Sequence, residues 1–487
     1  MSTNEVYEPP KNGWRTFVTV WITQSFSIVG SQIMFFALTI WIAQVLFPRP
    51  DQKEQLALAF AAEGIIFGVV TMLAAPIAGA WADRHDRKRT MIAMDFANGV
   101  LSIILMLLVA SQSLELWMWL IMAGILATTS TFHGAAFDTS YAMLVSEKRL
   151  PRANGMMQTI WSLAGILAPI IAAAILTLPG LARQGAITGD LGTWLGGLMD
   201  GTPITMGIDA ITYFMAAGVL VFLTIPSPKR TDLGGEGGKP KKSLWADVKE
   251  GGRYIWYRRP LLWLLGTFTV ANFFGSFWVL QPLLVKFNLA PDWQANGFTF
   301  ESALAFISTI IGIGGVVGGL FISSWGGLKK RRVYGVVIPM IIGGIAQIAY
   351  GLSLSIYLSA AMAFIVVGVI PILNAHSQAI WQTQTPRELQ GRVFSVRRVI
   401  AQFSAPIATA VAGWLGGLYN PGVVIAVFGA IMTLFCIGQM FNPFLLRVED
   451  KAWLDEMATQ REASAANRIA GGATSAPDLE VVSPVEE

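Results

Sequence analysis

Twelve long apolar segments dominate this sequence. Their approximate ranges are 16–46, 57–81, 90–110, 115–140, 155–178, 203–225, 260–287, 302–325, 333–353, 355–376, 397–417 and 421–446. Each is close to the roughly 20 residues that a helix needs to cross a bilayer, and a single segment satisfies its backbone groups in hydrocarbon only as a helix. Only 13% of the residues are charged, whereas soluble domains carry about 25%. We therefore expect an all-α membrane protein with twelve transmembrane helices in the lipid bilayer.

The loop between the second and third segments is dense in charge. Its sequence, AGAWADRHDRKR at residues 78–89, holds four cations and two carboxylates. Charges cost about 3 kcal/mol or more inside a bilayer, so this loop lies at a surface, and basic loops mark the cytoplasmic one. With the N-terminus placed inside, all 34 lysines and arginines are cytoplasmic except Arg49, Lys53, Arg183 and Lys286. This bias predicts a multi-pass protein of a bacterial-type plasma (inner) membrane, with both termini cytoplasmic.

The two halves of the chain resemble each other weakly. Gly68 and Trp81 match Gly312 and Trp325 at one constant shift, and a hydrophilic stretch rich in Gly, Pro and Lys separates the halves. Internal repeats of this kind are typical of secondary transporters, whose sites lie near the bilayer midplane between the repeats. We expect two pseudo-symmetric six-helix bundles. The predicted regions are a cytoplasmic N-terminus (1–15), an N-terminal six-helix bundle (16–225), a cytoplasmic linker (226–259), a C-terminal six-helix bundle (260–446) and a largely disordered cytoplasmic tail (447–487).

Several function classes do not fit this composition. The single cysteine, Cys436, excludes a disulfide within the chain, and the three histidines lack the spacing of a zinc enzyme. No G-x4-G-K-[ST] motif is present in the sequence, so an ATPase is not expected. The net charge of +4 is spread over loops, unlike a nucleic-acid-binding surface. We expect a monomer that is not an enzyme and that uses no cofactor or metal.

The charged loop resembles a known signature. Helices 2 and 3 of the major facilitator superfamily are joined by G-x3-D-R-x-G-R-[RK]. The matching residues here are Gly79, Asp83, Arg84, Arg87, Lys88 and Arg89. Asp86 departs from the signature, since the commonest form has glycine there. Together with LPRANGMMQ (150–158) and LQGRVFSVRR (389–398), this loop resembles the branch that contains macrolide efflux proteins and enterobactin exporters, and the resemblance covers about residues 15–446.

This resemblance implies a secondary active transporter that works by alternating access. It further implies proton-coupled efflux of a small molecule, an amphiphilic drug-like compound such as a macrolide. A siderophore carrier, a lysophospholipid carrier and a non-transporting sensor or scaffold of the same fold are the alternatives.

The signature residues predict a conformational latch. A carboxylate at the end of helix 2 can accept hydrogen bonds from loop arginines and from a helix N-terminus, which favours anions. If that cluster forms only when the cytoplasmic side is closed, it favours the outward-open state. The resemblance implies a latch made of Asp83, Arg84, Arg87 and Lys88. The alternative is that these charges only enforce topology.

Ionisable residues inside the apolar segments are candidates for proton coupling, because burying them is expensive. The candidates are Glu63, His133, Asp138 and Asp209. A carboxyl group in hydrocarbon can alternate between its protonated and ionised forms as water reaches it. In the superfamily, helices 1, 4, 7 and 10 line the cavity, which favours His133 and Asp138. Asp95 in helix 3 and Asp209 in helix 6 fit structural roles better, and Glu63 is the strongest single candidate.

Polar and aromatic residues in three helices predict a substrate cavity, because polar stripes avoid lipid and such mixtures suit a large, mostly apolar ligand. These residues are Gln24, Ser31 and Gln32 in helix 1, Asn272, Trp278 and Gln281 in helix 7, and Asn374 in helix 10. Hydrogen bonding between helices is the alternative.

Two stretches with small residues at helical spacing predict close helix packing, since small residues let neighbouring backbones approach. In helix 5, Gly165 and Pro169 belong to a stretch that resembles the G-x3-G-P-x2-G motif of antiporters, with ordinary packing as the alternative. Helix 8 carries Gly312, Gly314, Gly315, Gly318 and Gly319. We expect these glycines to pack against a helix of the other half.

Overall fold

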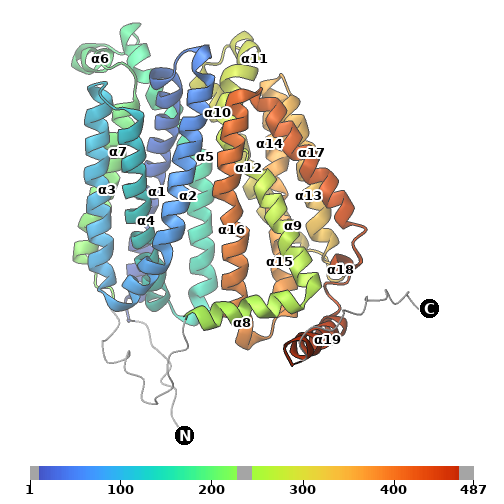
Figure 1. The fold of residues 1–487 in the computed structure, drawn as a ribbon. Helices are drawn as coiled ribbons and strands as arrows, with labels where there is room; N and C mark the ends of the chain where they lie inside the picture. The colour runs from blue at the N-terminus through green and yellow to red at the C-terminus, as the bar shows by residue number, and fades with distance from the viewer. Residues whose placement is uncertain (1–9, 227–243, 471–487) are drawn as a thin grey trace.

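The computed structural model describes residues 10–226 and 244–470. Within these ranges the chain is helical, with no strand, and twelve helical segments are long and apolar enough to cross a membrane. The expected all-α fold with twelve spans is therefore confirmed. The spans stand side by side, with the start of α1 (Gly13–Trp41) and the helix α19 (Lys451–Ala470) at one end (Figure 1). We call that end the inner face and the opposite end the outer face.

Six spans form the N-terminal half. They are α1, extended by a π-helical turn at Ile42–Leu46, α2 (Lys53–Arg84), α3 (Arg87–Ala110), α4 (Leu116–Leu144), α5 (Leu150–Arg183) and α7 (Thr202–Phe222). Short 3₁₀ turns at Pro50–Gln52 and Glu147–Arg149 precede α2 and α5, and α6 (Gly189–Gly196) lies at the outer face (Figure 1). Within this half, α1 packs on α5 and α7, and α4 packs on α2 and α3.

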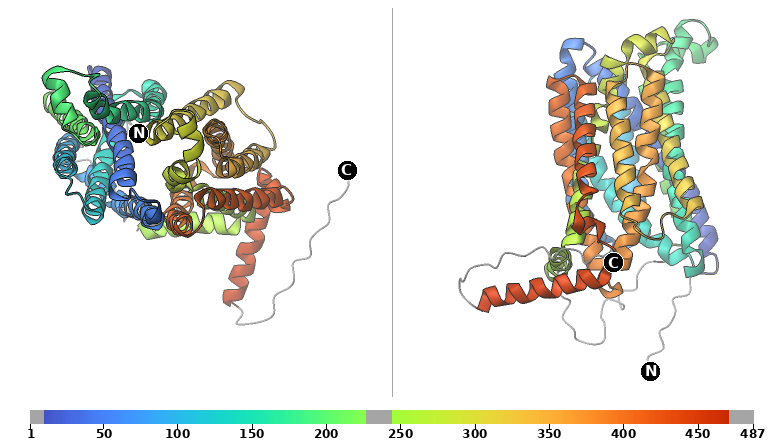
Figure 2. Two further views of the ribbon diagram at one scale, coloured as in Figure 1. Left: turned by 90° about the horizontal axis from the view of Figure 1, so that it is seen from above. Right: turned by 90° about the vertical axis from the view of Figure 1, so that its right-hand side faces the viewer.

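The C-terminal half repeats this plan. Its first span is broken into α9 (Arg259–Gly275), a 3₁₀ turn at Trp278–Leu280, α10 (Gln281–Leu283) and a π-helical turn at Leu284–Asn288. The other spans are α12 (Phe300–Trp325), α13 (Tyr334–Leu352), α14 (Ile356–Gly368) continued by α15 (Ile370–Gln384), α16 (Arg387–Leu418) and α17 (Pro421–Gln439). The short α11 (Ala290–Ala295) lies at the outer face (Figure 1). Seen from above, the halves lie side by side (Figure 2).

Asp86, the residue that departs from the loop signature, begins helix α3. Its backbone is extended, and its carboxylate accepts a hydrogen bond from the Arg89 N–H at 2.8 Å. Aspartate is a favoured residue at this position because the first N–H groups of a helix have no partner inside the helix. The loop between α2 and α3 therefore stays tight without the usual glycine.

Two helices outside the spans lie at the inner face: one runs below the C-terminal half, and the other projects outward beyond the bundle (Figure 2). They are α8 (Leu244–Tyr257) and α19, which follows the short α18 (Pro443–Leu446). The Tyr254 hydroxyl of α8 donates to the Gln384 carbonyl at 2.6 Å. Helix α19 buries Leu454, and its Asp455 pairs with Arg258 at 2.8 Å. The tail was expected to be largely disordered, and the structure describes a helix in it from Lys451 to Ala470, while residues 227–243 and 471–487 lie outside the described ranges.

Asp450 precedes α19 and caps it. Its carboxylate accepts hydrogen bonds from the Arg447 guanidinium at 2.8 Å and from the Trp453 N–H at 3.2 Å. Both contacts favour the ionised form and hold the pKa of the Asp450 carboxyl below its ordinary value. The stabilisation that this cap gives is present above the ordinary pKa and is lost as the pH falls through the lowered one.

The two halves meet along two helix pairs, α2 with α16 and α5 with α12. A Cβ added at Gly312 of α12 would lie 3.1 Å from the Gly165 carbonyl of α5, and one added at Gly68 of α2 would lie 3.2 Å from Pro406 of α16. The Gly165 carbonyl therefore lies against the other half, although a Cβ on Gly165 itself would meet nothing within 4 Å, and Pro169, one turn further along α5, is buried. Small residues at these four-helix contacts bring the backbones of the halves together.

The glycines of α12, the eighth span, pack against two different neighbours. Gly312 faces the N-terminal half, as expected. A Cβ at Gly314 would instead press on the Phe364 carbonyl, and one at Gly318 on the Gly368 carbonyl, both in α14 of the same half. The expectation that this stretch packs on the other half is thus wrong for Gly314 and Gly318. Four-residue spacing shows that two residues share a helix face, but it does not show which helix packs against that face.

Candidate functional site

A cavity of about 750 Å³ lies between the two halves. The N-terminal half supplies most of its wall. The C-terminal half contributes Trp278, Val279, Pro282 and Thr409. Ligand pockets commonly measure about 300–1,000 Å³, so this cavity is large enough for a drug-sized molecule.

The cavity extends towards the inner face and is closed towards the outer one. Its lining reaches the inner parts of α4 and α5 at Asp138 and Met157. On the outer side, α2 and α16 are in close contact, and a Cβ at Gly417 would lie 3.2 Å from the Glu54 Cα. The structure therefore holds the halves together at the outer end of the cavity.

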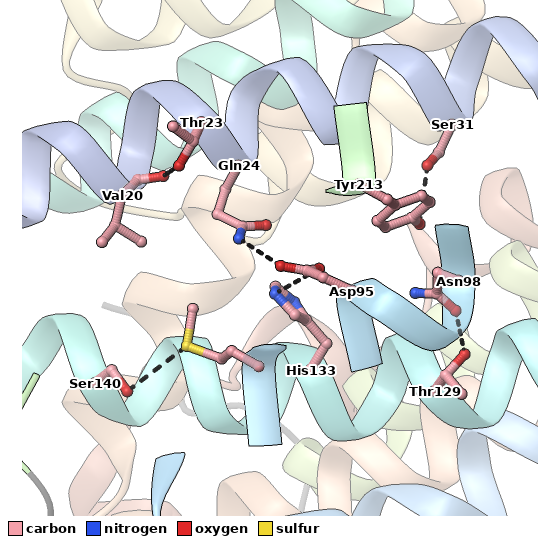
Figure 3. Close-up of polar contacts among 11 residues, drawn as sticks. Val20, Thr23, Gln24, Ser31, Asp95, Asn98, Thr129, His133, Ser140 and Tyr213 are labelled. Atoms are coloured by element: carbon pink, nitrogen blue, oxygen red, sulfur yellow. Dashed lines mark hydrogen bonds and ion pairs between the residues drawn. The ribbon is translucent and has the colours of Figure 1, made fainter. Parts of the chain in front are cut away.

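Asp95 is the centre of a polar cluster on the cavity wall (Figure 3). It is fully buried in α3, and its Oδ2 accepts a hydrogen bond from the Gln24 amide of α1 at 3.0 Å. Its Oδ1 lies 3.2 Å from Nε2 of His133 in α4. Neither of these two atoms has a well-aligned hydrogen-bond partner in the described parts of the chain. A proton shared between Oδ1 and Nε2 would satisfy both atoms.

Asp209 lies behind this wall and does not line the cavity. Its side chain, fully buried in α7, accepts hydrogen bonds from Ser31 at 2.8 Å and from Ser102 at 2.6 Å. The Ser31 hydroxyl is also 2.9 Å from the hydroxyl of Tyr213, which does line the cavity. Asp209 is thus linked to the cavity through Ser31 and Tyr213, and its hydrogen bonds join α1, α3 and α7.

Glu63 lines the outer part of the cavity on α2, among aromatic side chains. Phe35 and Phe67 flank it on the cavity wall and pack edge to face, with ring centroids 5.6 Å apart. Among the described residues, the lining contains three carboxylates, Glu63, Asp95 and Asp138, together with His133, and no lysine or arginine. Negative charge and aromatic faces both attract cations.

The cavity brings together part of the set predicted from the sequence. Predicted residues that line it are Gln24, Ser31, Gln32, Trp278, Glu63, His133 and Asp138. Asn272, Gln281, Asn374 and Asp209 do not belong to its lining. Asn272 donates to the Ala401 carbonyl at 3.2 Å and Gln281 to the Ser308 hydroxyl at 3.0 Å, so both join helices within the C-terminal half.

Among the lining residues that were not predicted as part of the site, Asp95, Asn98 and Tyr213 take part in the hydrogen bonds of this wall. Asn98 accepts a hydrogen bond from Thr129, which joins α3 to α4. The sequence does hold a signal for this wall, because Asp95, Asn98 and Ser102 recur at helical spacing on one face of α3. Asp95 was assigned a structural role because helices 1, 4, 7 and 10 were expected to line the cavity.

The predicted latch residues of the α2–α3 loop differ in their contacts. Arg87 is buried and donates to the carbonyls of Ala82 and Thr139, and Lys88 donates to the Val221 carbonyl at 2.8 Å. Asp83 and Arg84 are exposed. Arg87 and Lys88 therefore fasten the loop to the ends of α4 and α7 in the N-terminal half, whereas the Asp83 carboxylate faces solvent in this conformation.

The sequence of this chain is similar to that of known efflux proteins. A sequence model of the Major Facilitator Superfamily matches residues 20–409. Macrolide efflux protein A of Streptococcus pyogenes is 24% identical over 404 aligned residues, covering 81% of this chain and 88% of that protein. The multidrug efflux pump Tap of Mycolicibacterium fortuitum is 25% identical over 432 residues, covering 86% and 96%.

Solved structures resemble this fold over nearly its whole length. A bacterial homologue of the human lysosomal transporter Spinster, in an inward-facing and unoccupied conformation, matches with a TM-score of 0.59 at 14% identity and covers 95% of this chain and 99% of that one. PepTSo, a transporter of the POT family, matches with a TM-score of 0.61 at 12% identity and covers 90% and 99%. At these identities the likeness concerns the fold.

Proposed function

Because this chain belongs to the major facilitator superfamily, we propose that it exports a positively charged, amphiphilic drug-like compound by alternating access, in exchange for protons. The matched relatives named as efflux proteins support export as the direction. The lysine and arginine bias supports placing the inner face in the cytoplasm of a bacterial cell, with both termini there.

The choice of a cationic substrate class rests on the charged residues that line the cavity. A cationic amphiphile can place its charge near Glu63, Asp95 or Asp138 and its apolar body against Trp161, Trp278 and the phenylalanines of the wall. An anionic siderophore or a lysophospholipid phosphate would meet carboxylates, and the lining that the structure describes has no lysine or arginine to pair with it. A lipophilic amine, such as a macrolide with an amino sugar, fits this wall better than either alternative.

The same carboxylates supply the coupling to protons. A cavity carboxylate can be neutralised either by a proton or by the cationic substrate, so the two compete for it. We assign the main proton site to the Asp95–His133 pair, because it is buried and lies on the wall that a substrate would touch. Glu63 is a second carboxylate on that wall, whereas Asp209 is held by two serines behind it.

Binding of two ions of matched shape and opposite charge tests the substrate class. We expect the purified protein in detergent to bind tetraphenylphosphonium in equilibrium dialysis, and to bind the anion tetraphenylborate no better than empty micelles do, because like charges meet in the cavity. Glu63→Gln is expected to weaken cation binding. Glu115→Gln neutralises an exposed glutamate that does not line the cavity and is the control. Preferential binding of the anion would contradict the proposal, and cation binding without transport in proteoliposomes would favour a sensor.

The latch is tested by a pair of substitutions in one loop. Asp83→Asn is expected to reduce transport severalfold while leaving expression unchanged, because the exposed carboxylate makes no contact that the fold needs in this conformation. Asp86→Asn removes the same charge three residues away and keeps an N-cap side chain, so it is expected to transport normally. The measurement is uptake of tetraphenylphosphonium into inside-out vesicles. Equal effects of the two substitutions would show that the loop charges act on topology alone.

A further inference from the structure

Two lysines at the outer face donate hydrogen bonds from one half of the molecule to the other. Lys286, in the π-helical turn Leu284–Asn288 of the C-terminal half, donates to the carbonyls of Phe47, at 2.7 Å, and Ala43. Lys53, at the start of α2 in the N-terminal half, donates to the Tyr419 carbonyl at 2.9 Å. The two contacts cross between the halves in opposite directions.

Both lysines meet the carbonyl end of a helix. Ala43 lies in the turn Ile42–Leu46 that ends the first span, and Phe47 is the residue that follows it, while Tyr419 directly follows α16. The last carbonyls of a helix have no partner inside the helix and carry a partial negative charge, so an ammonium group there is favourable. Each half therefore supplies a lysine that caps the C-terminal end of a helix of the other half.

The other cations expected at the outer face make no such crossing. Arg49 pairs with Asp51, two residues along, at 3.5 Å, and both side chains are mostly exposed. Arg183 donates to the carbonyls of Leu198 and Met199, which belong to its own half. Lys53 and Lys286 are thus the two of these four residues whose contacts must break if the halves separate at the outer face.

The contacts lie where separation at the outer face would begin. Lys53 precedes Glu54, which packs against Gly417 where α2 meets α16. Lys286 follows Leu283 and Leu284, which are fully buried in a hydrophobic cluster that contains residues of both halves. We propose that Lys286 and Lys53 form an outer latch, which stabilises the conformation closed at the outer face and is released when that face opens. The outer latch concerns the conformational equilibrium of the chain and does not depend on which compound is carried.

Distances across the two faces test the outer latch. Spin labels at positions 113 and 294 report the outer face, and labels at 148 and 383 report the inner face; all four residues are exposed. The background carries Cys436→Ala, which removes the one native thiol. In Lys286→Met we expect the outer pair to gain a longer distance and the inner pair a shorter one. The ratio of outer-open to outer-closed molecules should rise on the order of tenfold, because a charged hydrogen-bond donor is lost.

Three variants make the result decisive. Arg183→Met removes an outer cation that also caps carbonyls, but within one half, and should leave both distances unchanged. Lys286→Arg keeps a donor and should restore the closed distance. Lys53→Met removes a more exposed donor and should give a smaller shift, and it serves as the test if Lys286→Met does not fold. Unchanged distances in both lysine variants, or an equal shift in Arg183→Met, would overturn the outer latch. A shift in a protein that moves no cation would leave the outer latch standing and reject the proposed function.

Discussion

Asp95→Asn is expected to abolish the exchange of protons for a transported cation. Asparagine has nearly the same shape and can still accept the Gln24 hydrogen bond, so the fold should survive. It cannot become negative, however, and so it cannot alternate between a proton and a cationic substrate beside His133. In proteoliposomes with a trapped pH indicator, addition of tetraphenylphosphonium should drive proton movement in the wild type and none above protein-free liposomes in Asp95→Asn.

The matched control is Asp209→Asn, since both aspartates are fully buried and only Asp95 lines the cavity. We expect Asp209→Asn to retain exchange. In the wild type, cation binding should weaken as the pH falls, because protonation removes the negative charge that attracts the ligand. That dependence should flatten in Asp95→Asn. Exchange at the wild-type rate in Asp95→Asn would move the proton site elsewhere, with Glu63 as the next residue to replace.

The second large effect concerns stability and one glycine of α12. Gly318→Ala would place a methyl group against the Gly368 carbonyl of α14, where backbone must move to admit it. Overpacking of this kind costs about 1–3 kcal/mol, and a rigid backbone neighbour favours the upper end. We expect a clearly lower midpoint in thermal unfolding of the purified protein in detergent.

The adjacent Gly319 provides the control, because a Cβ there would meet nothing within 4 Å. Gly319→Ala is expected to leave stability unchanged or to raise it by up to about 1 kcal/mol, as alanine is the better helix former. Equal midpoints for the two variants would mean that α12 and α14 do not pack as closely as described. The pair differs by one position, so composition and membrane insertion cannot explain a difference between them.

The sequence predicted the cavity wall well in the first span, α1, and poorly in the seventh span, which begins with α9, and helix geometry explains the contrast. α1 is continuous, so its regular spacing carries Gln24, Ser31 and Gln32 onto one face. The seventh span is interrupted after Gly275, at the end of α9, and passes through a 3₁₀ turn before α10. That interruption breaks the helical phase, which leaves Trp278 on the cavity and turns Gln281 towards Ser308.

What the sequence determined by itself was the number of spans, the charge bias and the family, since each depends on local composition or on a short motif. Whether a segment can span the bilayer depends mainly on its own polarity, so hydropathy alone is sufficient to identify the twelve helices. Only the tertiary structure decided which distant residues share a contact. Asp95 with His133, Gly318 with Gly368 and Lys286 with Phe47 are pairs of this kind. Periodicity gives the face on which a residue lies, but the packing of the other helices selects what that face meets.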